Sequence, residues 1–277
     1  MSVQTLELVR PDHPPPVWAA LRNEAAATSK AEPPLASLLD AVILCHDSLG
    51  EALSYQLARK MGDQVIMPIS LREICREAHE ADPGIVARAE ADLKAVFERD
   101  PACKGYLQPF LFFKGFIALQ AHRISHWLWT EGRETLAFYL QSRTSELFQV
   151  DIHPAAQMGS GLFIDHATGV VIGETAVVGD DVSMLHGVTL GGTGAERGDR
   201  HPKIGKGVLL GAGAKVLGNI QIGDYAKIAS GSVVLKAVPA GCTAAGVPAR
   251  LVNCPTCSEP AKSMDHTLPS SLYDYQI

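Results

Sequence analysis

The chain has 277 residues, of which 47% are hydrophobic and 19% charged, and its formal net charge is −6. This composition is typical of a folded globular protein with one or two domains, and the acidic balance disfavours broad electrostatic binding to nucleic acid. No apolar stretch approaches the roughly 18 to 20 residues that span a bilayer, and residues 1–10 do not form a signal peptide. We therefore expect no membrane partner and a cytoplasmic location.

The first part of the chain, residues 1–150, is predicted to be a helical domain used for oligomerisation. Asp82 and Pro83 have the form of an N-cap followed by proline at the first helical position. Pro109 is expected to open a second long helix, and Gly132 to separate it from a last helix. Aromatic residues within this region favour core or subunit contacts over a cofactor site.

After residue 150 the pattern changes to an aliphatic residue at every sixth position. These anchors are Ile152, Met158, Ile164, Ile172, Val178, Met184, Leu190, Ile204, Leu210, Val216, Ile222, Ile228 and Val234. A period of six fits neither an amphipathic helix nor a sandwich strand, but it is typical of a parallel β-helix. We therefore predict an α+β chain with a β-helix over residues 151–252 and a flexible C-terminal tail over residues 253–277.

Two departures from the six-residue period contain polar and ionisable residues. Two extra residues fall between Ile164 and Ile172, in a stretch that includes Asp165 and His166. A longer insertion, residues 191–203, carries Arg200 and His201. Insertions in a solenoid map to one face, which is often the binding face, and loops on a rigid scaffold are where catalytic residues concentrate.

His166 is the best candidate for a general base. A hydroxyl acceptor needs a base near neutral pH, and imidazole supplies one. Asp151 could fix the imidazole tautomer and stabilise the imidazolium that forms. The alternative is a histidine whose hydrogen bonds are satisfied within a turn.

Cysteine and histidine usage indicates no metal site. The six cysteines are scattered, which favours reduced thiols over a disulfide framework. Cys254 and Cys257 have the spacing of half a zinc site or a redox pair, but they lack the surrounding pattern, so we expect incidental thiols. Other histidines of the coils, such as His153 and His186, could hold zinc only between subunits, and we predict no metal.

The later coils are suited to a phosphate-bearing ligand with a long thin arm. Residues 211–214 and 229–232 consist of glycine, alanine and serine, which leave the backbone accessible. Lys227, other lysines nearby and Arg250 could offer positive charge to phosphates.

Several segments resemble the bacterial serine acetyltransferases of the hexapeptide-repeat acyltransferase family. They are DIHPAA, IDHATG, VIGETA, VTLGGTG, GDRHPKIG, GAGAKVLGNI and AAGVPARLV in the repeat region, with ALSYQLARKM, MPISLREI and RISHWLW in the helical part. The resemblance implies a left-handed β-helix and transfer of the acetyl group of acetyl-CoA to the hydroxyl of L-serine. The products would be O-acetyl-L-serine and CoA, in the first step of cysteine biosynthesis from serine. It implies acetyl-CoA as co-substrate and no permanently bound cofactor.

The resemblance also implies roles for individual residues. His166 would be the general base with Asp151 as its partner. The serine zwitterion would be held by Arg200 and His201 at its carboxylate and by Asp165 and Asp100 at its ammonium group. Acetyl-CoA would lie near Gly192, Ala212, Lys227 and Ser230.

Assembly and partners follow from the same resemblance. The family forms trimers with active sites between neighbouring β-helices and pairs them into homohexamers. A C-terminal isoleucine, here Ile277, docks into the partner enzyme O-acetylserine sulfhydrylase, and cysteine is a possible feedback inhibitor.

Other functions stay open at this point. One alternative is a hexapeptide acetyltransferase for a sugar or antibiotic hydroxyl. The others are a zinc-dependent β-helix of the carbonic anhydrase kind and a non-catalytic scaffold. An acyl-enzyme on Cys242 or Cys103 is a competing chemistry, disfavoured because neither has a histidine close in sequence.

Overall fold

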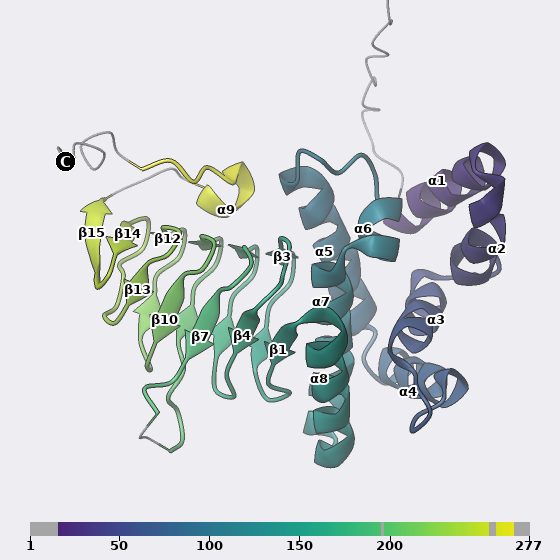
Figure 1. Ribbon diagram of the computed structural model, residues 1–277, viewed down its shortest axis with the longest axis horizontal. Coiled ribbons are helices and arrows are strands. Elements are labelled where there is room, and N and C mark those ends of the chain that lie inside the picture. The colour runs from purple at the N-terminus through teal and green to yellow at the C-terminus, as the bar shows by residue number, and fades with distance from the viewer. Residues whose placement is uncertain (1–15, 195–196, 255–258, 269–277) are drawn as a thin grey trace, which may run out of the picture.

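The protein joins a helical half to an elongated β-helix (Figure 1). The structure, a computed structural model, describes residues 16–194, 197–254 and 259–268. The helical segments are α1 (Val17–Ala31), η1 (Pro33–Leu35), α2 (Ala36–Leu39), η2 (Asp40–Leu44), α3 (Leu49–Met61), α4 (Pro68–Ala81), α5 (Gly84–Arg99), α6 (Leu107–Phe112), α7 (Lys114–Thr130) and α8 (Glu134–Phe148).

Local signals placed two of the three predicted helix boundaries correctly. The side chain of Asp82 accepts a hydrogen bond from the backbone N–H of Gly84, 2.9 Å away, at the start of α5. Gly132 has a positive φ of 73° between α7 and α8. The prediction that Pro109 opens a long helix was wrong, because Pro109 lies inside the short helix α6 and the long helix starts after the extended residue Phe113.

A buried ion pair fastens the helices to the first coil of the β-helix. Arg123 of α7 contacts Asp92 of α5 at 2.7 Å, with side chains 3% and 0% exposed. The other carboxylate oxygen of Asp92 accepts from the backbone N–H of Leu162 at 2.8 Å, and Arg123 donates to the carbonyl of Gly159 at 2.8 Å. The hydrophobic core runs without interruption from the helices into the coils. The helical half thus covers the first open end of the solenoid, whose unpaired strand edges would otherwise be exposed.

The β-helix consists of three parallel sheets. Sheet A contains β1 (Val150–Ile152), β4 (Val170–Ile172), β7 (Thr189–Gly191), β10 (Lys215–Leu217) and β13 (Val233–Val234). Sheet B contains β2 (Gln157–Met158), β5 (Val177–Val178), β8 (Lys203–Ile204) and β11 (Gln221–Ile222). Sheet C contains β3 (Phe163–Ile164), β6 (Ser183–Met184), β9 (Leu209–Leu210), β12 (Lys227–Ile228), β14 (Thr243–Gly246) and β15 (Ala249–Asn253), of which β15 is antiparallel to β14.

Every predicted anchor lies in a strand, and each anchor up to Val216 pairs with the anchor of the next coil. In sheet A, Ile152 lies opposite Ile172, which lies opposite Leu190. All the anchors except Met158 are buried. The period of six therefore predicted the β-helix correctly, because each hexad supplies one side of a three-sided coil.

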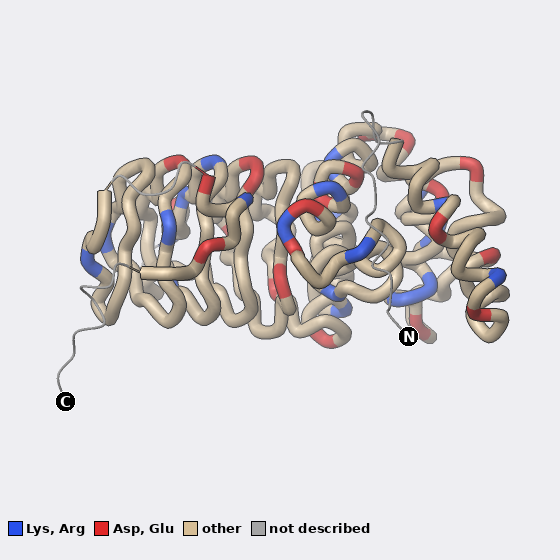
Figure 2. Tube along the Cα trace, turned by 90° about the horizontal axis from the view of Figure 1, so that it is seen from above, with Lys and Arg blue, Asp and Glu red and all other residues tan. Residues whose placement is uncertain are grey.

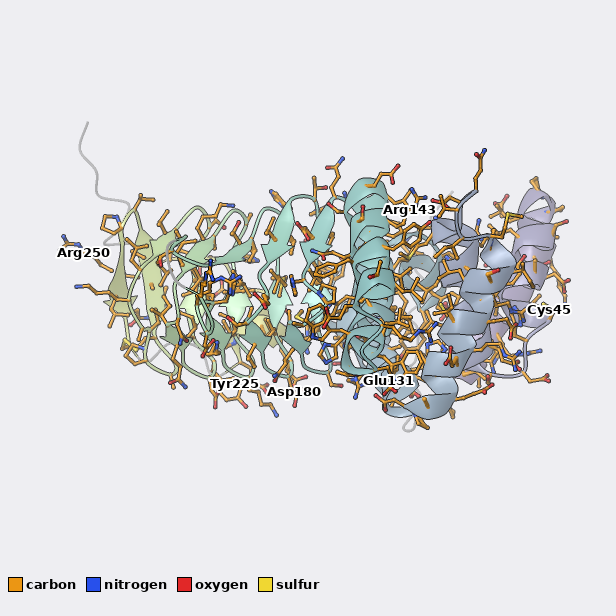
Figure 3. All side chains as sticks on the ribbon, turned by 90° about the horizontal axis from the view of Figure 1, so that it is seen from below. Cys45, Glu131, Arg143, Asp180, Tyr225 and Arg250 are labelled. Atoms are coloured by element: carbon orange, nitrogen blue, oxygen red, sulfur yellow. A yellow bond between two sulfur atoms is a disulfide. The ribbon has the colours of Figure 1, made fainter. Side chains whose placement is uncertain are left out.

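The two departures from the period lie on different edges of this three-sided solenoid. The extra residues around His166 form the turn from sheet C to sheet A, here called the C/A edge. The insertion lies between β7 of sheet A and β8 of sheet B, and its described residues between these strands, 192–194 and 197–202, mark the A/B edge. The third edge, between sheets B and C, carries Asp180 and Tyr225, which project from the side of the β-helix in Figure 3. Both departures therefore border sheet A.

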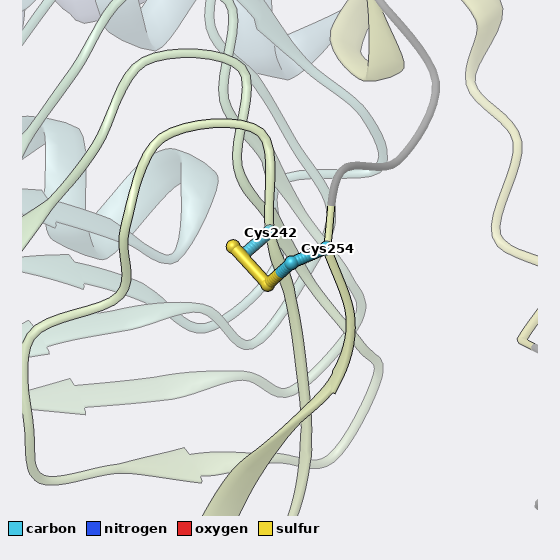
Figure 4. Close-up of a disulfide and its surroundings, with 2 residues drawn as sticks. All are labelled: Cys242 and Cys254. Carbon is cyan, nitrogen blue, oxygen red and sulfur yellow. A yellow bond between two sulfur atoms is a disulfide. The ribbon is translucent and has the colours of Figure 1, made fainter.

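The C-terminal segment corrects two expectations. Cys242 and Cys254 form a disulfide (Figure 4), so the prediction of reduced thiols was wrong for this pair. Cys45, Cys75 and Cys103 are free thiols, and Cys257 lies outside the described residues. Part of the predicted tail is also packed: α9 (Pro260–Ser263) lies against α5 and β9, and its residue Ala261 is 1% exposed.

Basic and acidic residues are interspersed along both halves of the molecule (Figure 2). Among the described residues, no helix has the length and apolar character needed to cross a membrane.

Candidate active site

A cavity of about 400 Å³ opens at the C/A edge, where the helices meet the first coil. Asp100, Asp165 and His166 all line it. Asp165 lies in the turn after β3, and Asp100 directly follows the last residue of α5. The structure thus brings together three predicted site residues that are far apart in the sequence.

His166 is held by an unusual backbone in the turn. Its φ is 55°, in the left-handed region that non-glycine residues adopt rarely. The side chain is 74% exposed, and its Nε2 lies 3.7 Å from a carboxylate oxygen of Asp165. Burial raises the pKa of Asp165, as does the charge of Asp100, whereas the charge of His166 lowers it. The cavity therefore presents an accessible imidazole beside two carboxyl groups.

Close packing of α7 on β3 positions this cavity. A Cβ on Gly115 would lie 2.0 Å from the carbonyl oxygen of Ile164, so only glycine permits the helix to approach this closely. Next to it, Lys114 donates a hydrogen bond to the hydroxyl of Thr168 in the His166 turn. The helical half thus supplies one wall of the cavity.

A strip of small residues continues along the C/A edge from His166. The ring of His186 packs edge-to-face against that of His166, with 6.0 Å between the ring centroids. In the following coils the N–H of Gly213 donates to the carbonyl of His186 at 2.9 Å, and that of Gly231 donates to the carbonyl of Ala212 at 2.8 Å. Ala212 and Ser230, which are both predicted to contact acetyl-CoA, lie in this strip.

Lys227 lies elsewhere, on the outer side of sheet C. It is 7% exposed, and its Nζ donates to the carbonyl oxygen of Thr267 at 2.5 Å. The segment that follows α9 therefore covers Lys227. A phosphate could reach this lysine only after that segment moved.

A second polar cluster lies at the A/B edge. Arg200 pairs with Glu174 at 2.7 Å, and the hydrogen bond from Arg200 lowers the pKa of the Glu174 carboxyl. His201 is 6% exposed and hydrogen-bonds to Thr175 through Nδ1. Gly192 belongs to the same cluster, because a Cβ there would lie 3.4 Å from Cγ of Arg200.

Asp151 belongs with this second cluster. Its carboxylate accepts a hydrogen bond from the side-chain amide of Gln141 on α8, at 2.6 Å. Burial lowers the pKa of His153, the charges of Glu174 and Asp151 raise it, and the charge of Arg200 lowers it. All three charged groups therefore lie near this ring. Among the described contacts, no hydrogen bond or ion pair joins Asp151 to His166. Asp151 lies in β1 of sheet A, in register with Val171, and the expected pair is not joined within one chain.

The family models match both halves of the chain. The model described as "Serine acetyltransferase, N-terminal" matches residues 17–121, and the one described as "Bacterial transferase hexapeptide (six repeats)" matches residues 201–236. The serine acetyltransferase of Salmonella typhimurium is 55% identical over 249 residues, which are 90% of this chain and 91% of that protein. This chain belongs to the serine acetyltransferase family.

Solved structures of serine acetyltransferases have the same fold. One in complex with cysteine has a TM-score of 0.90 at 52% identity and covers 91% of this chain and 98% of its own. One from Neisseria gonorrhoeae in complex with serine has a TM-score of 0.83 at 56% identity, covering 84% and 96%. One from Brucella abortus strain S19 in complex with coenzyme A has a TM-score of 0.86 at 52% identity, covering 89% and 99%.

Sequence reasoning left out several residues that support the site of this serine acetyltransferase family member. Gln141 contacts Asp151, Glu174 pairs with Arg200, and Thr175 contacts His201. The segment VIGETA, which contains Glu174 and Thr175, contributed to the resemblance without any role for these two residues. Counting strands in threes places this segment one coil before the Arg200 insertion on the same edge, which is the signal that would have found them.

Proposed function

We propose that the chain transfers the acetyl group of acetyl-CoA to the hydroxyl of L-serine at active sites that two neighbouring copies build together. The reaction itself is that of the serine acetyltransferase family, to which the chain belongs. The observation that supports the shared site is the presence of two half-sites on the two borders of sheet A. His166, Asp165 and Asp100 form the first, and Asp151, Arg200 and His201 with Glu174 form the second.

A ring of three copies would complete the site. In a cyclic trimer each copy presents different surfaces to its two neighbours, so the C/A edge of one chain can meet the A/B edge of the next. Val171, on the outer face of sheet A, is a 40% exposed apolar residue between the two edges and would be covered there. Exposed apolar residues at the start of α4, including Met67 and Ile69, would join two trimers into the expected hexamer.

The proposed step is direct transfer with one general base. The imidazole of His166 removes the proton of the serine hydroxyl while the serine oxygen attacks the thioester carbonyl. The tetrahedral intermediate then expels the CoA sulfur, which takes the proton back from the imidazolium. Asp151 of the neighbouring copy would orient the ring and stabilise its charged form. Arg200 and His201 would bind the serine carboxylate, and Asp100 and Asp165 its ammonium group, as charge-assisted hydrogen bonds.

Acetyl-CoA would lie between the copies, along the strip of small residues at the C/A edge. Ala212 and Ser230 belong to the strip itself, and Gly192 would face it from the neighbouring A/B edge. Lys227 would join only after release from Thr267. A relative solved with coenzyme A supports this co-substrate. We propose that cysteine, which differs from serine in a thiol for the hydroxyl, competes at the same site; a relative was solved with cysteine.

Docking of O-acetylserine sulfhydrylase on Ile277 stays a prediction, because Ile277 lies outside the described residues. The cytoplasmic location is likewise a prediction.

The test is a thiol-release assay with acetyl-CoA and a panel of hydroxyl acceptors that includes L-serine, sugars and aminoglycosides. Serine should release CoA, and His166→Ala should lower the rate by about 10²- to 10⁴-fold, the usual contribution of a general base. A sugar or an antibiotic that outperforms serine would support the alternative acceptor class. Equal rates for His166→Ala and wild type would exclude the proposed base.

A further inference from the structure

Thr175 lies at the A/B edge, in the turn between β4 and β5, and has no part in the steps above. The insertion of the next coil leaves sheet A after Gly191 and returns to the solenoid at Lys203. Near the end of the insertion, Arg200 and His201 hydrogen-bond to the turn that contains Thr175.

One hydroxyl anchors the backbone of both residues. The Oγ1 of Thr175 accepts hydrogen bonds from the backbone N–H of Arg200 at 3.0 Å and from that of His201 at 3.1 Å. The Nζ of Lys203 donates to the carbonyl of Thr175 at 2.8 Å. Thr175 therefore ties the backbone of Arg200 and His201 to the preceding coil.

The same residue fixes the tautomer of His201. The backbone N–H of Thr175 donates to Nδ1 of His201 at 3.1 Å, and the Oγ1 of Thr175 lies 2.9 Å from that nitrogen. A backbone N–H can only donate, so Nδ1 must carry a lone pair and the ring proton must be on Nε2. The hydroxyl accepts two N–H bonds, and its own proton lies within reach of Nδ1 and of the Asp199 carboxyl, whose pKa is lowered by hydrogen bonds from Lys203 and Thr175.

The ring has little room to change this arrangement. His201 is 6% exposed, and a Cβ on Gly173 would lie 2.0 Å from its Nε2. Burial lowers the pKa of His201, and the charge of Arg200 acts in the same direction. Among the described residues none accepts a hydrogen bond from Nε2. His201 thus offers one neutral donor beside the guanidinium of Arg200.

We propose that Thr175 is a positioning residue for recognition of the acceptor's carboxylate. Its N–H holds His201 as a neutral Nε2–H donor, and its hydroxyl holds the backbone of Arg200 and His201, so that the carboxylate receives a hydrogen bond from each side chain. The inference rests on the proposed function, which assigns Arg200 and His201 to the carboxylate of serine. Thr175 would thereby determine selectivity for hydroxyl acceptors that carry a carboxylate.

Steady-state kinetics of Thr175→Val and Thr175→Ser, in the full-length assembled enzyme, tests the proposal. Valine has nearly the same shape and leaves two part-buried N–H groups without their acceptor. KM for serine should rise about 10- to 100-fold with a smaller change in kcat, and KM for acetyl-CoA should stay the same. Serine at position 175 keeps the hydroxyl and should restore KM. The control Thr130→Val removes a threonine hydroxyl at the end of α7 and should change neither constant.

Ethanolamine separates a positioning role from a structural one. It carries the ammonium and hydroxyl of serine but no carboxylate. The constant kcat/KM for ethanolamine, measured over a range that extends to high concentrations, should therefore be the same in Thr175→Val and wild type. An equal fall for both acceptors, or an unchanged KM for serine, would overturn the proposal. In the second case serine turnover itself would still stand, so the proposed function and this inference fail separately.

A readout independent of activity is the ¹⁵N NMR spectrum of histidine-labelled wild type at neutral pH. The signals of His201 are those lost in His201→Gln. They should show a bare Nδ1 and a protonated Nε2. A proton on Nδ1 would contradict the proposed hydrogen-bond pattern whatever acceptor the enzyme uses.

Discussion

Replacing Arg123 by methionine should destabilise the chain strongly, because it leaves the carboxylate of Asp92 charged and buried. Asp92 is 0% exposed and receives hydrogen bonds from Gln120 at 3.0 Å, from Arg123 and from the N–H of Leu162. Removing one partner of a buried pair costs about 3–5 kcal/mol, against a total stability of about 5–15 kcal/mol for a typical domain.

The double variant isolates the electrostatic part of this cost. Asparagine at position 92 keeps the shape and one acceptor oxygen but removes the charge. Asp92→Asn with Arg123→Met should therefore be more stable than Arg123→Met alone by about 2 kcal/mol, because it no longer buries an unpaired charge. A control, Arg76→Met, breaks an exposed pair with Glu73 and should cost less than about 1 kcal/mol.

Urea unfolding followed by circular dichroism measures these differences, at one protein concentration because the stability of an oligomer depends on it. A double variant no more stable than Arg123→Met, or an Arg123→Met variant no worse than Arg76→Met, would refute the reasoning that this charge pair fastens the helices to the first coil.

Three further predictions concern the site. Gly173→Ala should raise KM for serine by at least about tenfold, since its Cβ would lie 2.0 Å from Nε2 of His201 and displace the ring; kinetics like those of wild type would mean that the ring is not used. KM for serine should rise as pH falls through the pKa of Asp165, which burial raises, because the protonated carboxyl no longer attracts the ammonium group. This rise in KM should be absent in Asp165→Asn. If the rise persisted in that variant, another group would be responsible for it. Truncation after Ser263 removes Thr267 and should lower KM for acetyl-CoA in wild type but not in Lys227→Ala; the same change in both backgrounds would show that Lys227 does not contact the co-substrate.

Much of the fold followed from local patterns because a β-helix repeats its packing every few residues. Ile172 and Leu190 lie in neighbouring coils at the same position, and the hexads place them there without any long-range information. Pro109 was misplaced because proline is tolerated in the first turn of a short helix as well as at the start of a long one. The period does not reveal whether Cys242 and Cys254 are paired, since that depends on the antiparallel return of β15 along β14.

The sequence named candidate site residues but did not reveal their arrangement. His166 and Arg200 stood out because the repeat is interrupted where they occur. Counting the anchors in threes would have shown that His166 and Arg200 lie on different edges. The interruption that contains His166 follows the third anchor of a coil, and the one that contains Arg200 follows the first anchor of a coil. Contacts such as Gln141 with Asp151 depend on how α8 lies against β1, and no spacing in the sequence encodes that.

The central claim is that each active site takes residues from two copies, and subunit complementation tests it most directly. His166→Ala and Arg200→Ala damage opposite half-sites, so each alone should be nearly inactive. Co-expressed and assembled together, they should recover activity, because some interfaces then pair an intact His166 with an intact Arg200. A mixture of His166→Ala with Asp100→Ala, both in the same half-site, should stay inactive. Recovery in the first mixture only is the predicted result, and no recovery there would contradict the shared site.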